Sequence, residues 1–251
     1  MRKLPALLLL LVLLPMAVPA AAQSAFTEAQ RSEIVEILRR ALREDPSILR
    51  EALTGLDAAD QRARAGAQRD AIRANAGALF SDAADPVRGN PRGDVTIVEF
   101  FDARCPYCKQ MQPAMDALLR RDPNIRVVMK DLPILGPSSV VAARALLAAH
   151  RQGRYAAYYD ALIALRGEPT EAVLREQAQR VGLDWNRLRR DMDDPTIAQR
   201  IEANLRLAQA LGVDGTPALV IGPDANAAQL VPGALELAQL ERMVSQARAS
   251  R

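Results

Sequence analysis

The residues best suited to chemistry are the two cysteines of the chain, which stand together as Cys105-Pro106-Tyr107-Cys108. A disulfide across so few residues restricts the unfolded chain little, so a purely structural bridge explains the pair poorly. A zinc site takes about four ligands, and the single histidine, His150, lies far along the chain. The spacing therefore favours dithiol–disulfide exchange. Cu(I) binding is an alternative use of the same two soft thiolates.

The cysteine pair follows an expected strand and opens an expected helix. Residues 95–101 are rich in β-branched and aromatic side chains and predict a buried strand. Pro106 suits the first position of a helix, which places Cys105 at or beside the N-cap, where free backbone N–H groups favour a thiolate. Cys108 follows about one turn later on the same face. We therefore expect Cys105 to attack a substrate disulfide and Cys108 to resolve the mixed disulfide.

Two stretches of the sequence resemble those of a known family. Residues 99–109, Glu-Phe-Phe-Asp-Ala-Arg-Cys-Pro-Tyr-Cys-Lys, are similar to the active-site stretch of the DsbA-like branch of the thioredoxin superfamily. Gly215-Thr216-Pro217-Ala218, followed by the apolar residues 219–221, resembles the cis-proline loop of that family. The resemblance covers roughly residues 78–248 and implies an α/β thioredoxin fold, expected over residues 78–251, with a helical insertion at about 135–212.

The resemblance also implies roles for individual residues. Thr216 and a cis Pro217 would flank the redox pair and hold substrate backbone, whereas an ordinary turn proline would be trans. Glu99 matches the buried acid of the family and could accept the proton of Cys108, the alternative being an unremarkable strand-edge carboxylate. Tyr107 stands where the best-known members carry histidine, so we expect a less oxidising couple. The resemblance implies no cofactor.

The first 22 residues read as a secretory signal peptide. Arg2 and Lys3 precede an apolar run at 8–14, and the small residues 20–22 offer a cleavage site. An uncleaved membrane anchor is the alternative. Both alternatives imply that the body of the protein is exported, so we expect it in the periplasm. Removing the two basic residues lowers the net charge from +3 to +1, which argues against a nucleic-acid partner.

Residues 23–56 predict an N-terminal helical arm. Apolar residues recur at helical spacing on both sides of Asp45-Pro46, which indicates two short amphipathic helices, the first capped by Thr27 and Gln30. Residues 57–77 carry few large apolar side chains and predict an exposed linker helix or a flexible tether. The arm is too short for a core of its own, so it packs on its own domain or between chains. Its layout resembles the oligomerisation segments of ScsC-like DsbA relatives, which implies a homo-oligomer, by resemblance a trimer.

Further elements follow the cysteine helix. We predict a strand at 125–129, helices, a hairpin of residues 219–221 with 229–231, and a closing helix at 235–247. The helices before the hairpin begin at Ser138 or Ser139, at Thr170 and at Asp194-Pro195, and end near residues 150, 181 and 211. Their order fits the helical insertion that the resemblance implies.

The sequence thus predicts an exported thiol-disulfide oxidoreductase, most simply an oligomeric disulfide isomerase or reductase. A monomeric dithiol oxidase and a Cu(I)-binding copper-stress protein are the alternatives. Its expected partners are exported proteins with non-native disulfides or free thiols, and a membrane redox protein that resets Cys105 and Cys108.

Overall fold

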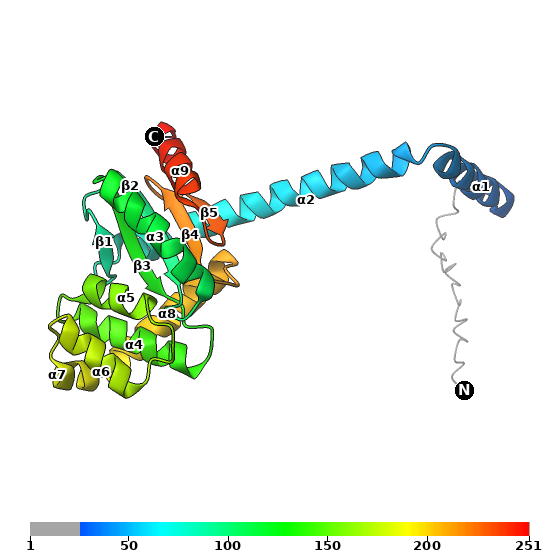
Figure 1. Ribbon diagram of the computed structural model, residues 1–251. Helices are drawn as coiled ribbons and strands as arrows, with labels where there is room; N and C mark the ends of the chain where they lie inside the picture. Colours follow the sequence, from blue (N-terminus) through cyan, green and yellow to red (C-terminus); the bar gives the residue numbers. More distant parts are fainter. Residues whose placement is uncertain (1–25, 251) are drawn as a thin grey trace, which may run out of the picture. The chain divides into compact units, whose positions relative to one another are not determined.

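The computed structural model describes residues 26–250, so the predicted signal peptide lies outside the described residues. The chain divides into two compact units, one ending at Asp60 and the other beginning at Gln61 (Figure 1). None of the helices in the described part is long and apolar enough to cross a membrane.

The first unit contains helix α1, Glu28–Glu44, and the beginning of α2, Ser47–Ala74. The predicted capping box is confirmed, because the Thr27 backbone N–H donates to Gln30 Oε1 at 2.8 Å and the Gln30 N–H donates to Thr27 Oγ1 at 3.3 Å. The prediction of a short second helix is wrong, since α2 continues through most of the expected linker at 57–77. Its Ala, Arg and Gln residues favour helix strongly enough to continue it without a core, so the linker is a helix rather than a tether.

The first unit exposes its apolar side chains. Within the described residues, α1 has no buried residue, and Leu38 and Leu53 are 55% and 56% exposed. Large apolar side chains so exposed along two helices are typical of a surface that packs against another protein. The other exposed members are Phe26, Ile34, Val35, Ile37, Leu42, Ile48, Leu49 and Leu56.

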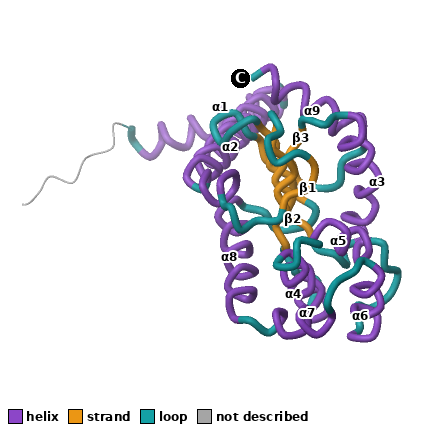
Figure 2. Tube along the Cα trace, turned by 90° about the vertical axis from the view of Figure 1, so that its left-hand side faces the viewer, coloured by secondary structure: helices purple, strands orange, loops and turns teal. Residues whose placement is uncertain are grey.

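The second unit is built on a five-stranded sheet in the order β1-β3-β2-β4-β5. Strands β2 and β3 are parallel, and the other neighbours are antiparallel. Figure 2 shows the strands between α8 on one side and α3 and α9 on the other. This is the thioredoxin arrangement that the sequence predicts. The strands are β1 Val87–Gly89, β2 Val95–Phe101, β3 Ile125–Asp131, β4 Ala218–Gly222 and β5 Gln229–Pro232.

Helices cover both faces of this sheet. Along β2, Ile97 and Phe101 belong to the core on the α3 side, whereas Val98 and Phe100 belong to the core that includes Leu207 of α8, because successive side chains of a strand point to opposite faces. The remaining helices are the π-helical turn η1 Gly77–Ser81, then α3 Pro106–Arg121, α4 Pro137–His150, α5 Tyr155–Ile163, α6 Glu171–Arg180, α7 Trp185–Met192, α8 Pro195–Leu211 and α9 Leu237–Ala249.

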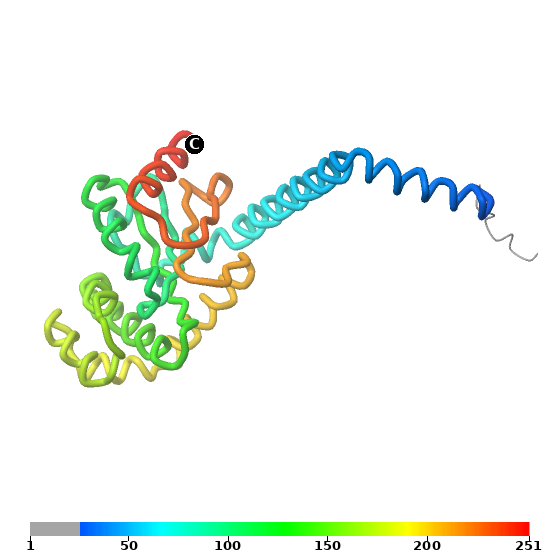
Figure 3. The backbone as a smooth tube through the Cα atoms, turned by 45° about the vertical axis from the view of Figure 1, so that its right-hand side comes forward, coloured from blue at the N-terminus to red at the C-terminus, as the bar shows by residue number. Residues whose placement is uncertain are grey.

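Helices α4 to α8 form the predicted insertion between β3 and β4, and Figure 3 shows them gathered at one end of the second unit. Thr170 and Asp194 cap α6 and α8 as predicted. The predicted cap at Ser138 or Ser139 is wrong, because α4 begins one residue earlier, with Pro137 in its first turn. Gly136, at φ +99°, supplies the backbone conformation that precedes it.

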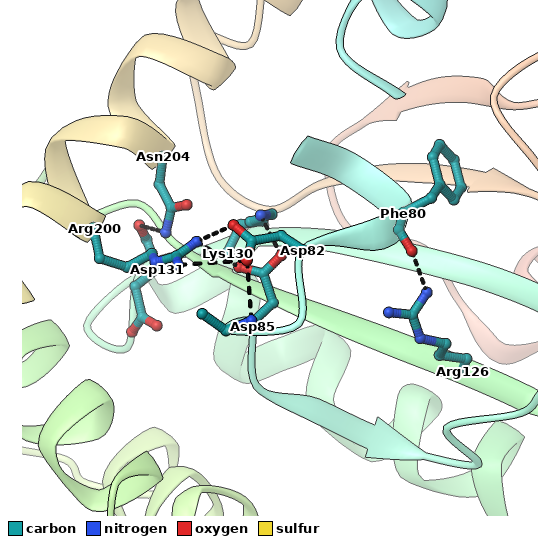
Figure 4. Close-up of polar contacts among 9 residues, drawn as sticks. Phe80, Asp82, Asp85, Arg126, Lys130, Asp131, Arg200 and Asn204 are labelled. Carbon is teal, nitrogen blue, oxygen red and sulfur yellow. Dashed lines mark hydrogen bonds and ion pairs between the residues drawn. The ribbon is translucent and has the colours of Figure 1, made fainter. Parts of the chain in front are cut away.

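A buried ionic cluster ties the insertion to the sheet (Figure 4). Lys130 of β3 donates from Nζ to Asp85 Oδ2 at 2.5 Å, and both side chains are almost completely buried. Arg200 of α8 reaches the same Asp85, Nη1 to Oδ1 at 3.4 Å, and also pairs with Asp82. Because buried charges are costly without partners, these contacts fix α8 and the segment before β1 on one face of the sheet.

Candidate active site

The sequence places Cys105 where the structure begins helix α3. Cys105 is the N-cap residue, and Pro106 follows as the first helical residue, as predicted. The Cys105 backbone N–H donates to Asp102 O at 2.9 Å, and the Lys109 N–H donates to Cys105 O at 3.1 Å. Cys105 therefore lies at the N-terminal end of α3, which carries a partial positive charge.

The loop before β4 lies against Cys105. The Thr216-Pro217 peptide bond is cis, which confirms that prediction. Cys105 Sγ donates to Thr216 O at 3.2 Å, so residues 111 positions apart in sequence meet at one point. The Gly233 N–H donates to Pro217 O at 2.9 Å and holds the loop from behind. A cavity of about 340 Å³ borders Thr216 and Pro217, where an extended polypeptide could lie.

Cys108 lies one turn deeper in α3 and is completely buried. Burial raises the pKa of its thiol well above the ordinary value, and the nearby charges of Cys105 and Glu99 act in the same direction. At neutral pH the sulfur therefore carries its proton. It becomes a nucleophile only if a neighbouring group accepts that proton.

Glu99 has the properties of such an acceptor. Glu99 is completely buried in the central strand β2, so it is not an exposed carboxylate at a strand edge. Neither of its carboxylate oxygens has a hydrogen-bond partner among the described residues. Burial raises the pKa of Glu99 to about 7, while Arg88 acts to lower it and Asp116 to raise it. A carboxyl group with this pKa can give and take a proton near neutral pH.

Asp102 organises the turn before the cysteines, and the sequence reasoning did not identify it. Its Oδ1 accepts from the Arg104 N–H at 2.8 Å, and its Oδ2 accepts from the N–H groups of Ile134 and Leu135 at 3.0 and 3.1 Å. The bond to Arg104 is an Asx turn, which an aspartate in a short loop could have suggested. The bonds to residues 134 and 135 leave no local signal, because those residues follow another strand.

The surface around the pair is partly basic. Tyr107 is 63% exposed, whereas Lys109 donates from Nζ to Leu165 O and is half-buried. Arg104 donates to Leu135 O at 3.2 Å and pairs with Glu168. A cavity of about 680 Å³ lies on this side, lined by Arg104, Pro106, Lys109, Gln112, Asp116 and Arg166 among others.

In residues 26–250 no group of three or more His, Cys, Asp or Glu side chains gathers to hold a metal ion.

Comparison with known proteins identifies the family. Residues 96–245 match the DSBA-like thioredoxin domain. The chain belongs to this DsbA-like family of thiol-disulfide oxidoreductases. The antiporter NhaA 1 of Salinispora arenicola is 40% identical over 139 residues, which are 55% of this chain and 21% of that protein. The chain thus spans about a fifth of the length of this relative.

Solved structures agree with the family and with the predicted layout. A thioredoxin-like oxidoreductase from Silicibacter pomeroyi is 44% identical, with a TM-score of 0.65, over 70% of this chain and 98% of that chain. ScsC of Proteus mirabilis, in a transitional conformation, is 29% identical, with a TM-score of 0.65, over 92% of this chain and 100% of that chain. The predicted resemblance to the ScsC-like branch is thereby confirmed.

Proposed function

We propose that the protein is an exported disulfide isomerase or reductase that works as a homo-oligomer. The observation that carries the proposal is the arrangement of three groups: Cys105 at the N-terminus of α3 against the cis-proline loop, Cys108 buried beneath it, and Glu99 buried without a partner among the described residues. Its substrates are then exported proteins with non-native disulfides or free thiols. A membrane redox protein resets the pair after each oxidation.

The exchange proceeds in two steps. The Cys105 thiolate attacks one sulfur of a client disulfide, forming a mixed disulfide and releasing the other client sulfur as a thiolate that takes a proton from water. Cys108 then gives its proton to the Glu99 carboxylate and attacks Cys105 Sγ, so the Cys105–Cys108 disulfide forms and the second client thiolate leaves. Thr216 and Pro217 hold the client backbone beside the reacting sulfurs during both steps.

Two features favour the isomerase or reductase direction over the oxidation of client thiols. Tyr107 lies between the cysteines and offers no imidazolium to stabilise the thiolate, which favours a less oxidising couple. The exposed apolar side chains of the first unit favour association between chains, and an assembly presents several redox pairs to one misfolded client. Three chains are proposed because the layout is ScsC-like, and the leader at residues 1–22 takes the chain to the periplasm.

The cysteine roles are tested by trapping. The whole chain with Cys108→Ala should accumulate a mixed disulfide with insulin, whose chains are joined by disulfides. The adduct persists because the thiol of Cys108, which would release insulin from Cys105, is absent. The Cys105→Ala chain should form none, and both variants should lose essentially all catalysed insulin reduction. Mass spectrometry of the non-reduced adduct identifies the cysteine involved. A stable adduct at Cys108 in the Cys105→Ala chain would contradict the assignment.

A further inference from the structure

Arg88 of β1 is a buried cation near the active site that the exchange steps above do not use. Its Nη2 contacts Asp116 Oδ1 at 2.8 Å and Asp160 Oδ1 at 3.1 Å. Its Nη1 donates to Gln112 Oε1 at 3.5 Å, and its guanidinium carbon lies 4.7 Å from the centre of the Tyr159 ring. We call these five residues the Arg88 cluster.

The cluster is held in one arrangement by bonds among its own members. Gln112 Nε2 donates to Asp116 Oδ1 at 2.8 Å, and the Tyr159 hydroxyl donates to Gln112 Oε1 at 2.9 Å. The Tyr159 ring packs edge-on against Phe101 of β2, with the ring centres 5.0 Å apart. Because Gln112 Oε1 and Asp116 Oδ1 each accept two of these hydrogen bonds, Arg88 cannot move without breaking several of them.

The cluster also lies next to the chemistry. Gln112 and Asp116 follow Cys108 by four and eight residues in α3, so all three lie along one face of that helix. Glu99 and Phe101 are two residues apart in β2 and face the same core. The Arg88 cluster therefore borders the face of α3 that carries Cys108 and packs, through Tyr159, against the face of β2 that carries Glu99.

The surroundings of Glu99 contain few other charges. Its strand neighbours in register are Met129 and Leu219, and α9 contributes Leu240 and Val244 to this core. The titratable groups that act on Glu99 or respond to it come from β1, α3 and α5 and are Arg88, Cys108, Asp116, Tyr155 and Tyr159. Arg88 favours the carboxylate form of Glu99, and Asp116 opposes it.

We propose that the Arg88–Asp116 ion pair is a positioning device for the resolving step, in which Arg88 keeps Glu99 ready to accept the Cys108 proton and Asp116 limits that effect. The inference rests on the proposed function, because it concerns the second step of disulfide exchange. The proton moves from Cys108 Sγ to a Glu99 oxygen, the Cys105–Cys108 bond forms, and the bond between Cys105 and the client breaks.

The test follows the resolving step as a function of pH. The reduced whole chain, in excess, is mixed in a stopped-flow instrument with 5,5′-dithiobis(2-nitrobenzoate). Attack by Cys105 releases one coloured thiolate, and resolution by Cys108 releases the second. The rate of the second phase should rise with pH around a midpoint near 7, where Glu99 becomes a carboxylate.

The two partners of the ion pair should move this midpoint in opposite directions. Arg88→Met should raise it by about one pH unit, and Asp116→Asn should lower it by a smaller amount, since nearby charges shift a pKa by about 1 to 3 units. Arg88→Lys should restore most of the wild-type profile. Arg121→Met, which removes the exposed ion pair between Arg121 of α3 and Glu241 of α9, should leave the midpoint unchanged.

If the ion pair had only a structural role, the Arg88 and Asp116 variants would not shift the pH midpoint of the second phase in opposite directions. Shifts of both variants in the same direction, or no shift in either, would overturn the proposal. In a Glu99→Gln background, the substitution at Asp116 should no longer move the profile. If Arg88→Met fails to fold, the proposal is still tested by the other two variants. Asp116→Asn should lower the pH midpoint, and Arg88→Lys should keep most of the wild-type profile. A wild-type chain without any second phase would instead refute the proposed function itself.

Discussion

The two units of the chain differ in how they bury apolar side chains and where they place their ion pairs. The second unit buries an apolar core on each face of its sheet and pairs the charges within it, as Lys130 with Asp85. The described part of the first unit exposes its large apolar side chains, and its ion pairs, such as Arg39 with Glu36, lie in solvent.

This difference indicates that the second unit is stable as a single chain, whereas the helices of the first unit need a partner surface on which to pack. A helix gains most of its stability from packing an amphipathic face, and α1 has no buried residue within the described part of the chain. The second unit carries its own core and all the groups of the redox site. We infer that chemistry belongs to one unit and association to the other.

The largest effect on folding should come from the buried ion pair. Lys130→Met leaves Asp85 buried with Arg200 as its remaining partner, and breaking such a pair costs about 3 kcal/mol of unfolding free energy. The only tryptophan of the sequence, Trp185, lies in the second unit, so urea unfolding followed by its fluorescence measures this loss. Arg39→Met is the control and should change the free energy by less than about 0.5 kcal/mol. Equal effects of the two variants would contradict the comparison.

A smaller effect should appear as a pH dependence of stability. Burial raises the pKa of Asp131 in the folded chain to about 8, although the hydrogen bond from Tyr155 acts to lower it. Because this pKa is above the unfolded value, the stability it contributes is complete below about pH 4 and is lost as the pH rises toward 8. Asp131→Asn removes this loss and should make the second unit more stable than wild type at pH 8, by at least about 1 kcal/mol.

The matched control for Asp131 lies in the first unit. Asp57 is exposed in α2, and Asp57→Asn should leave the dependence of unfolding on pH unchanged. Urea titrations at pH 5 and pH 8 compare the three chains. An Asp131→Asn chain that loses stability between these pH values as steeply as wild type would show that Asp131 does not titrate as described.

The smallest effect on the fold should come from the apolar side chains of the first unit. Leu38→Glu with Leu53→Glu should leave the unfolding of the second unit unchanged, because both side chains are exposed. The same double change should reduce the molecular mass in sedimentation velocity to that of one chain. Leu205→Glu, an exposed position of α8, is the control and should preserve the mass. A chain whose mass is unaffected by the double change would refute association through the arm.

Local signals allowed much of the fold to be predicted. The β-branched run before the cysteines predicted β2, and Pro106 predicted the start of α3. The prediction that Pro217 is cis came from resemblance. Strand β1 was not predicted because three residues carry no periodic pattern. A linker helix was one of two alternatives for residues 57–77, but its continuity with the preceding helix was not predicted, because these residues carry few large apolar side chains.

The polar contacts within the second unit could not be predicted. Arg88 meets Asp160 across 72 positions, and Lys130 meets Asp85 across 45. Such pairs depend on which strands become neighbours, and no local spacing encodes that. Glu99 could be proposed from resemblance, but the cluster that surrounds it becomes visible only once β1, α3 and α5 are packed together.

The most direct experiment asks whether association through the first unit turns the redox unit into an isomerase. The reduced whole chain is given ribonuclease with scrambled disulfides, beside the Leu38→Glu/Leu53→Glu chain at equal concentration of sites. We expect both chains to react equally fast with 5,5′-dithiobis(2-nitrobenzoate), while only the associated wild type restores ribonuclease activity efficiently. Equal reactivation by both chains, or a wild type that oxidises dithiols but reactivates nothing, would contradict this expectation.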